Sequence, residues 1–339
     1  MSLHKPRAFP YRAPHNLIIK KYSWLVPPLE VRVGVIGCGW FGSAHARVYR
    51  AIGDAKLVAV ADKDENAARR LAEYYHVNYY TSVEGMIRKE SLDAVSVVVT
   101  PQHLFEVTKE ALELGVSVLT EKPIVTSRNE LFLLSSLVKK GGIFMPGFIE
   151  LFNPAVVKLK ELLKDEIIGS ISSISSRRAG RLPKKILGWK IGVILDLGIH
   201  EAYVHRYLMD EDPLDSLSYT ARLLNDGEGE DLAILIFSYP SNVIAIIEAN
   251  WLTTAGIRSM TITGEDGSIS LDYADQFIRV ERGDHSLIPR LRKEEPLYKE
   301  LSHFIESIKG GKDPVVGFEF AEDVLNNIFN AMDRRIVPK

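Results

Sequence analysis

Three glycines in one short stretch are the first residues whose spacing suggests chemistry. Gly37, Gly39 and Gly42 form a G-x-G-x-x-G pattern directly after the apolar run from Val31 to Ile36. Between a strand and a helix, the first glycine permits a tight turn, the second lets a pyrophosphate approach the backbone, and the third lets the helix pack closely. The N-terminus of that helix offers free N–H groups and a positive dipole to phosphates. The pattern predicts a dinucleotide site; the plainer alternative is a glycine-rich turn.

An acidic residue stands where it would complete this site. Asp62 ends the second apolar run, twenty residues past Gly42, which is the usual place for an acid that takes the ribose hydroxyls. The alternative is an ordinary surface aspartate. Asp62 would repel a 2′-phosphate, so we expect NAD rather than NADP, although Lys63 beside it weakens that preference.

Two further motifs follow apolar runs. Thr100-Pro101-Gln102-His103 comes after Val-Ser-Val-Val-Val, and Glu121-Lys122-Pro123 ends the next run. Parallel strands bind ligands at their carboxyl edge, so Lys122 is expected to point toward the nicotinamide. Its alternative is a solvated lysine before a bend at proline.

Asp196 and His200 are four residues apart in a predicted helix and therefore share one face. Histidine suits general acid/base work near neutral pH, and a carboxylate nearby can fix its tautomer. The alternatives are a surface pair or two metal ligands. We expect no metal, because a third protein ligand would be needed and His205 faces elsewhere on the helix.

The elements that must position these residues fall into two patterns. Short apolar runs alternate with helical segments as far as residue 150, which predicts a doubly wound parallel sheet, an α/β Rossmann domain. Its expected strands are Val31 to Ile36, Lys56 to Ala61, Ala94 to Thr100, Ser117 to Thr120 and Ile143 to Met145; its expected helices are Gly42 to Ala51, Asn66 to Tyr75, Leu104 to Leu114 and Asn129 to Lys140.

From residue 151 to 339 the pattern predicts an α+β domain with an open, mostly antiparallel sheet. The expected strands are Leu217 to Leu224, Asp231 to Tyr239, Val243 to Trp251, Ser259 to Thr263, Ser268 to Tyr273 and Phe277 to Arg282. The expected helices are Pro154 to Lys164, Val193 to Met209, Leu297 to Lys309 and Glu319 to Arg334.

The composition narrows the class of partner. A net charge of −2 over 339 residues, with a pI near 6.5, provides no broad positive field for nucleic acid or an anionic membrane, so a small molecule is expected. The single cysteine, Cys38, fits a reducing compartment, and the apolar runs are too short to span a membrane, so we expect a cytoplasmic protein. Residues 1 to 30 are read as an N-terminal extension.

The chain resembles the Gfo/Idh/MocA family of oxidoreductases from about Val31 onward. The resemblance rests on the ordered combination of the glycine loop, Glu121-Lys122-Pro123 and the segment Asp196 to His200. The resemblance implies that Lys122 and His200 touch the reacting hydroxyl or carbonyl, and that the open sheet mediates a homodimer or homotetramer. We expect the cofactor to contact the loop, the acid and the two strand tips: Gly37, Gly39, Trp40, Phe41, Gly42, Asp62, Lys63, Thr100, Pro101, His103, Glu121 and Lys122.

Within the family the chain looks most similar to UDP-N-acetylglucosamine 3-dehydrogenases, in the stretches Gly147 to Pro154, Asp196 to His200, Asn250 to Thr253 and Glu294 to Leu297. It departs from them at Phe105, at Leu151, and at Tyr203, where an aspartate often follows the histidine by three residues. A basic run just before Asp196 is the expected diphosphate site, or else a solvated loop: Arg177, Arg178, Arg181, Lys184 and Lys185. The expected substrate-binding residues are Glu150, Asn153, Arg178, Arg181, Asp196 and Trp251.

The hypothesis from sequence is an NAD-dependent dehydrogenase in which His200 takes the proton of a ring hydroxyl, such as the carbon-3 hydroxyl of a UDP-N-acetyl sugar. Lys122 stabilises the developing oxyanion and Asp196 orients the substrate or His200. Three alternatives stay open: a glycoside hydrolase that recycles bound NAD, a dehydrogenase of a free sugar or polyol such as inositol, and a non-catalytic NAD-responsive protein.

Overall fold

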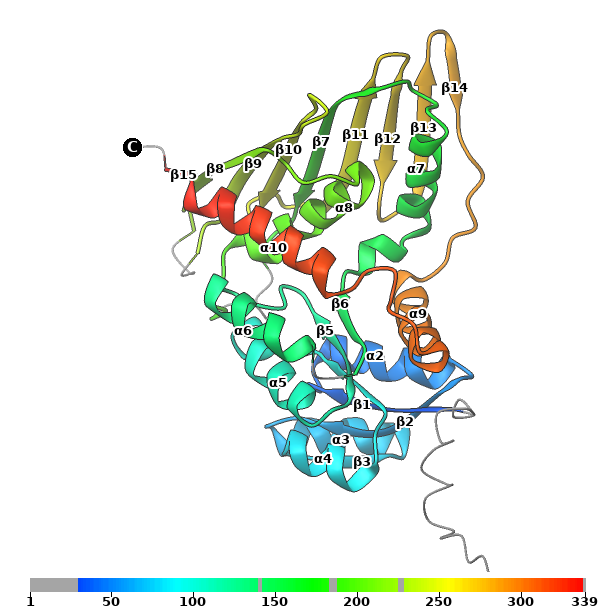
Figure 1. The fold of residues 1–339 in the computed structure, drawn as a ribbon, viewed down its shortest axis with the longest axis vertical. Coiled ribbons are helices and arrows are strands. Elements are labelled where there is room, and N and C mark those ends of the chain that lie inside the picture. Colours follow the sequence, from blue (N-terminus) through cyan, green and yellow to red (C-terminus); the bar gives the residue numbers. More distant parts are fainter. Residues whose placement is uncertain (1–29, 140–141, 183–187, 225–228, 338–339) are drawn as a thin grey trace, which may run out of the picture.

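The computed structural model describes residues 30–139, 142–182, 188–224 and 229–337 (Figure 1). The predicted N-terminal extension therefore lies outside the described residues, apart from Glu30. Two sheets organise this part of the chain, and the predicted order of a parallel sheet followed by a mostly antiparallel one is confirmed. In the described part of the chain, no helix is long and apolar enough to cross a membrane.

The first sheet is parallel throughout. Its strands are β1 (Val31–Ile36), β2 (Ala55–Ala61), β3 (Asn78–Tyr80), β4 (Ala94–Val97), β5 (Ser117–Glu121) and β6 (Phe144–Gly147). The connecting helices are α2 (Trp40–Ala51), α3 (Glu65–Tyr75), α4 (Val83–Glu90), α5 (Pro101–Glu113) and α6 (Arg128–Val138). The order β3-β2-β1-β4-β5-β6 reverses direction between β1 and β4, which is where open sheets of this kind bind ligands at the carboxyl edge.

The second sheet has nine strands in the described part of the chain. They are β7 (Ile171–Ala179), β8 (Asp215–Ala221), β9 (Leu232–Ser238), β10 (Ile244–Asn250), β11 (Ile257–Gly264), β12 (Ser268–Asp272), β13 (Phe277–Arg282), β14 (His285–Leu287) and β15 (Arg335–Ile336). Their order is β14-β13-β12-β11-β7-β10-β9-β8-β15, and only the β7–β10 and β8–β15 pairings are parallel.

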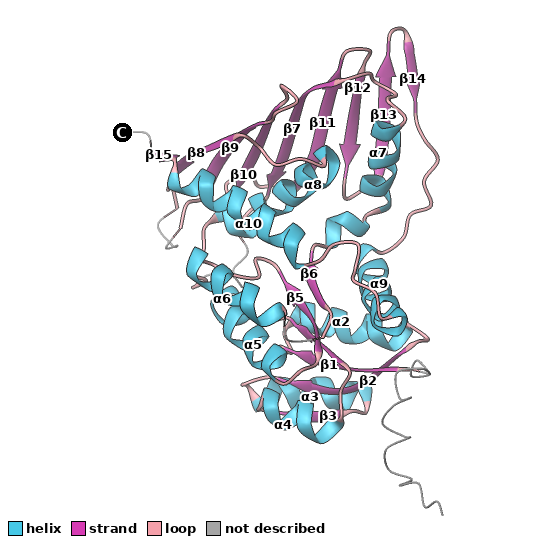
Figure 2. Cartoon of the chain, in the orientation of Figure 1, coloured by secondary structure: helices cyan, strands magenta, loops and turns pink. Residues whose placement is uncertain are grey.

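Helices cover one face of this second sheet. They are α7 (Pro154–Lys164), α8 (Ile199–Met209) and α10 (Phe318–Asp333), which lie in front of the strands in Figure 2. Buried residues alternate along the strands as this one-sided cover requires; Ala245 and Ile247 of β10 are buried, while Ile244 and Ile246 are exposed. The uncovered face therefore carries a partly apolar surface.

The end of the chain returns to the first sheet. Helix α9 (Pro296–Gly310) packs against α2 and β1, and its side chains Leu301 and Phe304 share a core with Val31 and Val33. The ion pair between Arg47 and Glu295 joins the same surfaces. The predicted domain boundary at residue 150 stays a prediction. Residues of α9, which lies far beyond that boundary, pack into the core of the first sheet.

The expected elements miss two features that matter for the site. The segment 171–179, of which residues 177–179 were read as part of a basic loop, is the long strand β7 between β10 and β11. The helix expected from Val193 to Met209 begins instead with a π-helical turn, η3 (Ile194–Gly198), before α8. Strand β3 and helix α4 were also not predicted, because their short segments lack a long periodic pattern.

Candidate active site

The glycine loop leaves its backbone open at the start of α2. Gly37 has φ of +101°, and a Cβ there would lie 2.3 Å from the carbonyl oxygen of Val98. A Cβ on Gly42 would lie 1.7 Å from the carbonyl oxygen of Gly37, so the helix packs directly on the turn. Gly39, which precedes α2, has no atom within 4 Å of a Cβ position, and no described side chain caps the helix. The N–H groups at this helix start therefore fit a dinucleotide phosphate.

The predicted ribose acid is held against this loop. Asp62 accepts hydrogen bonds from the backbone N–H groups of Cys38, at 2.7 Å, and Asp64, at 2.9 Å. Lys63 Nζ lies 3.4 Å from His103 Nε2, which brings the end of β2 next to the start of α5. Burial, followed by the charge of Asp62, raises the pKa of the Cys38 thiol to about 12, so this thiol stays protonated.

The other predicted cofactor residues at this edge lie at helix starts. Trp40 and Phe41 open α2, with ring centroids 5.0 Å apart, while Thr100 precedes α5 and Pro101 is its first residue. Glu121 is buried instead, where its carboxylate contacts His45 Nε2 at 3.2 Å. These positions put the predicted residues along one edge of the first sheet.

Lys122 reaches from the end of β5 to the second unit of the fold. Its ammonium donates to the carbonyl oxygen of Asp196 at 2.7 Å and to Oδ1 of the same residue at 2.8 Å. The other carboxylate oxygen of Asp196 accepts from Trp251 Nε1 at 3.1 Å. Both partners of the ion pair are only partly exposed, at 18% and 11% of their side chains.

The π-helical turn η3 sets the position of Asp196. Glu230 accepts from the Ile194 N–H at 3.0 Å, which satisfies a backbone donor at the start of the turn. A Cβ on Gly192 would lie 2.1 Å from Glu230 Oε1, so a larger residue there would displace this carboxylate. Such turns inside helices occur often at functional sites. This one places the carbonyl and carboxylate of Asp196 together on Lys122.

His200 opens α8, directly after that turn. Its Nδ1 lies 2.7 Å from the hydroxyl of Tyr203, which also accepts from the Glu150 N–H at 3.2 Å. The Tyr203 ring is fully buried and stacks on Phe148 with centroids 4.3 Å apart. The tyrosine therefore fixes the orientation of the imidazole, which leaves Nε2 without a hydrogen-bond partner among the described residues.

Three of the expected substrate residues belong to a buried hydrogen-bond network. Arg178 donates to Glu150 at 2.8 Å and to Glu201 at 2.7 Å, and its side chain is only 3% exposed. Asn153 donates to Glu150 and to the Tyr273 carbonyl oxygen, both at 3.0 Å. The structure thus brings Glu150, Asn153 and Arg178 together, but in contact with one another. Tyr273 donates to Glu201 at 2.7 Å and closes the network.

The network sets the electrostatics around His200. Burial, followed by the positive charges of Arg178, Lys122 and Arg258, lowers the pKa of His200 well below its ordinary value of 6.5. Although burial alone would raise the pKa of Glu150, the contacts with Arg178 and Asn153 hold it below the ordinary carboxyl value. His200 is therefore neutral at physiological pH.

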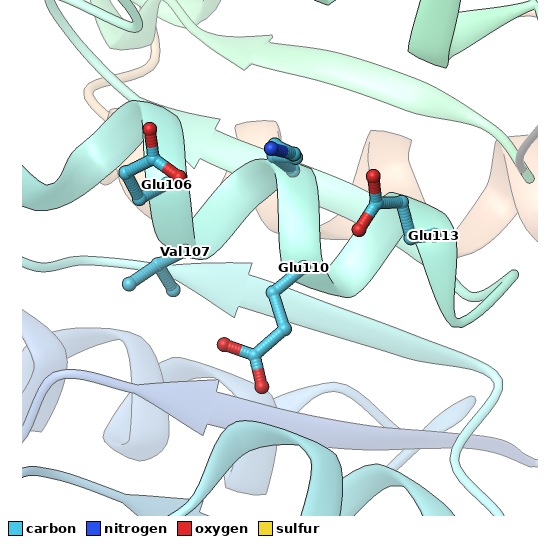
Figure 3. A pocket seen from close by; sticks show the side chains of 5 residues that line it. Glu106, Val107, Glu110 and Glu113 are labelled. Atoms are coloured by element: carbon cyan, nitrogen blue, oxygen red, sulfur yellow. The ribbon is translucent and has the colours of Figure 1, made fainter.

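Of the remaining predicted residues, Arg181 is exposed, while Lys184 and Lys185 lie outside the described residues. The sequence reasoning missed Glu201, although it directly follows His200, and it missed Tyr273, which adjoins no motif. It treated Tyr203 only as a departure from the family pattern. It also missed Arg258, which pairs in register with Arg178 across β7 and β11. A shallow surface hollow on α5, lined by Glu106, Val107, Lys109, Glu110 and Glu113, contains none of these residues (Figure 3).

Comparisons with known proteins agree with this geometry. Residues 31–148 match the model of an oxidoreductase family with an NAD-binding Rossmann fold, and residues 156–270 match the Gfo/Idh/MocA C-terminal domain. The myo-inositol 2-dehydrogenase of Thermotoga maritima is 26% identical over 85% of this chain and 91% of its own. The UDP-N-acetylglucosamine 3-dehydrogenase of Acidithiobacillus ferrooxidans is 25% identical over 83% and 89%.

Solved structures show the same fold. That of the Acidithiobacillus ferrooxidans UDP-N-acetylglucosamine 3-dehydrogenase aligns with a TM-score of 0.80 at 23% identity, over 90% of this chain and 98% of the other. A levoglucosan dehydrogenase in complex with NADH and levoglucosan aligns with a TM-score of 0.82 at 18% identity, over 90% and 97%. With both family models matched in order along the chain, the protein belongs to the Gfo/Idh/MocA family and is an NAD-binding oxidoreductase.

Proposed function

We propose that the protein is a dehydrogenase that moves hydride between NAD and a ring carbon of a sugar-like substrate, with carbon 3 of a UDP-N-acetyl sugar as the preferred case. The observation that carries this proposal is the ion pair between Lys122 and Asp196, the residue that begins the Asp196 to His200 segment. The pair joins Lys122, which follows β5 of the first sheet, to a residue four positions before the neutral imidazole of His200, whose pKa the Lys122 charge lowers. Relatives named for sugar and inositol oxidation support the substrate class.

Each side chain then has a separate task. NAD, when bound, supplies the hydride acceptor. The Lys122 ammonium donates a hydrogen bond to the substrate oxygen and stabilises negative charge that develops there. Asp196 and Trp251 hold the ammonium in place, and His200 exchanges the proton of the substrate hydroxyl through Nε2. The buried Glu150–Arg178–Glu201 network supports His200 and makes no contact with substrate.

We assign recognition of a diphosphate to exposed arginines rather than to Arg178. Arg258 pairs in register with Arg178 and lies two and four residues before the buried Met260 and Ile262, so it is on the same helix-covered face of the sheet although it is itself exposed. It has no carboxylate partner within ion-pair distance among the described residues. Together with exposed Arg181, it offers bidentate donors to a phosphate group.

The test is a screen of UDP-sugars, free sugars and inositols with NAD, followed by the absorbance of NADH. Turnover of UDP-N-acetyl sugars, lost in Lys122→Ala and His200→Ala but kept in Lys158→Ala, is expected; Lys158 is a surface lysine of α7 paired with Glu161. Full activity of either site variant contradicts the proposed roles. Turnover of inositol alone keeps the dehydrogenase and rejects the nucleotide sugar.

A second candidate has a specific observation behind it. The 2,7-anhydro-N-acetylneuraminate hydratase of Escherichia coli is 29% identical over 72% of this chain and 68% of its own length, and a hydratase is named for a reaction without net redox change. A redox-neutral enzyme, such as a glycoside hydrolase that recycles NAD, would release product without accumulating NADH. Product analysis beside the absorbance assay separates the two.

We also propose that two copies associate through the uncovered face of the second sheet. Outward side chains of β8, β9 and β10 form a partly exposed apolar patch: Tyr219, Ile234, Ile244 and Ile246. An exposed apolar face on a sheet is a typical site of association. The predicted cytoplasmic location stays a prediction.

A further inference from the structure

The hydroxyl of Tyr203 contacts two groups, and the chemistry of each group limits whether it donates or accepts the hydrogen bond. The Glu150 backbone N–H is a donor only, and it reaches the Tyr203 oxygen at 3.2 Å. His200 Nδ1, at 2.7 Å, is a donor or an acceptor according to its tautomer. Among the described residues the fully buried Tyr203 hydroxyl has no other hydrogen-bond partner.

Counting hydrogens distinguishes the two tautomers of neutral His200. If Nδ1 carried the proton, Tyr203 oxygen would accept twice and its own hydrogen would be buried without an acceptor. If Nδ1 is unprotonated, the Tyr203 hydroxyl donates to it and the Tyr203 oxygen accepts from Glu150, so Nδ1, the hydroxyl and the Glu150 N–H are all paired. An unpaired buried hydroxyl costs enough to favour the second arrangement by roughly 5- to 140-fold, at tenfold per 1.4 kcal/mol.

We infer that Tyr203 is a positioning residue that keeps the proton of His200 on Nε2, so that the resting enzyme presents an N–H donor to the substrate oxygen. The statement that Nε2 faces the substrate rests on the proposed function. The tautomer itself follows from contacts within the protein.

The identity of residue 203 matters because a carboxylate in its place would act in the opposite sense. An ionised Asp only accepts hydrogen bonds, so it would hold the proton on Nδ1 and leave a lone pair on Nε2. A tyrosine that already accepts from a backbone N–H does the reverse. With Lys122 also donating, the resting site offers two donors to one oxygen, which complements a carbonyl or an alkoxide better than a hydroxyl proton. Hydroxyl oxidation then requires the minor tautomer.

The first experiment reads the tautomer directly, by nitrogen NMR of protein labelled with ¹⁵N in its histidine rings. The His200 signals are identified as those lost in His200→Gln, and spectra are recorded on the full chain without substrate. We expect the unprotonated type of shift at Nδ1 and the protonated type at Nε2. A protonated Nδ1 overturns the inference, whether or not the enzyme turns over any substrate.

Two variants at residue 203 extend the test, with Tyr207→Phe as the matched control from the same helix, since no described residue hydrogen-bonds the Tyr207 hydroxyl. Tyr203→Phe should weaken the preference for the Nε2 proton, and Tyr203→Asp should move the proton to Nδ1. All three variants keep the charged groups that surround His200, and only Tyr203→Asp adds a new one; the groups kept are Lys122, Arg178, Arg258, Glu150, Asp196 and Glu201.

Activity supplies a readout that a merely structural role would not move. In Tyr203→Asp the added carboxylate stabilises the imidazolium, so the acid limb of the kcat/KM profile should shift to higher pH, while Tyr207→Phe keeps the wild-type profile. An unchanged nitrogen spectrum in Tyr203→Phe and an unmoved profile in a folded Tyr203→Asp both contradict the inference. If no substrate is found but the wild-type spectrum is as expected, only the proposed function fails.

Discussion

Replacing Arg178 by methionine tests whether the buried network holds the second unit of the fold together. Arg178 is 3% exposed at its side chain, and its partners Glu150 and Glu201 are 7% and 0% exposed. Methionine keeps much of the aliphatic length but leaves two buried carboxylates without their cation. Removing one partner of a buried ion pair costs about 3–5 kcal/mol, because the remaining charge stays desolvated.

Arg177 provides a matched control, since it is the same residue type on the same strand but points to the other face. Its pair with Glu248 is 44% and 33% exposed, and exposed pairs contribute about 0–1 kcal/mol. The free energy of unfolding is measured by urea titration with tryptophan fluorescence. Arg178→Met should lose at least about 2 kcal/mol more than Arg177→Met.

The difference in stability between wild type and Arg178→Met should also depend on pH. Although burial opposes it, contact with Arg178 lowers the pKa of Glu150 in the folded protein below its ordinary value of 4.5. A lowered carboxyl pKa stabilises the fold above that value, and the stabilisation is lost as pH falls through the folded pKa. The gap between wild type and Arg178→Met should therefore narrow below about pH 4.5. Equal losses in the two arginine variants would refute the argument.

Three further predictions concern the cofactor, the acid limb and the association. Gly42→Ala should abolish NAD binding measured by calorimetry, because a Cβ there would lie 1.7 Å from a loop carbonyl oxygen, whereas Gly53→Ala, which meets no atom within 4 Å, should bind normally. Since burial lowers the pKa of His200 below 6.5, kcat/KM should not fall as pH drops through 6.5. A fall in kcat/KM near pH 6.5 that is absent in His200→Gln would contradict the lowered pKa. Ile246→Lys should convert an oligomer to a monomer in light scattering, and a wild-type monomer would reject the proposed surface.

Local sequence pattern predicted the parts of the structure that local physics determines. The glycine loop, its strand and its helix lie within a dozen residues, so their types and order specify the geometry of Gly37 to Gly42. The Lys122 tip and the Asp196 segment were placed in the same way, by strand ends and helical spacing. Their direct contact joins residues 74 positions apart and was not predicted. The family resemblance implied only that Lys122 and His200 meet at the reacting group of the substrate.

The failure to predict strand β7 has one physical cause, which is the burial of polar side chains. Strand β7 alternates as a strand should, but two of its inward residues are Ser176 and Arg178, whose partners His205, Glu150 and Glu201 come from other elements. A rule that treats arginine as exposed therefore reads this strand as a basic loop. No local sequence pattern predicts such partners, because they are adjacent only after folding.

The return of α9 to the first sheet bears on how the protein is made. Leu301 and Phe304 complete a core that begins at Val31, so that core stays open until translation has passed residue 304 of 339. A nascent NAD-binding unit would hold an uncovered apolar strip for nearly the whole of synthesis, and a fragment that ends near residue 150 would keep it. Fusion partners or cleavage sites inserted before α9 would separate the unit from its own closing segment.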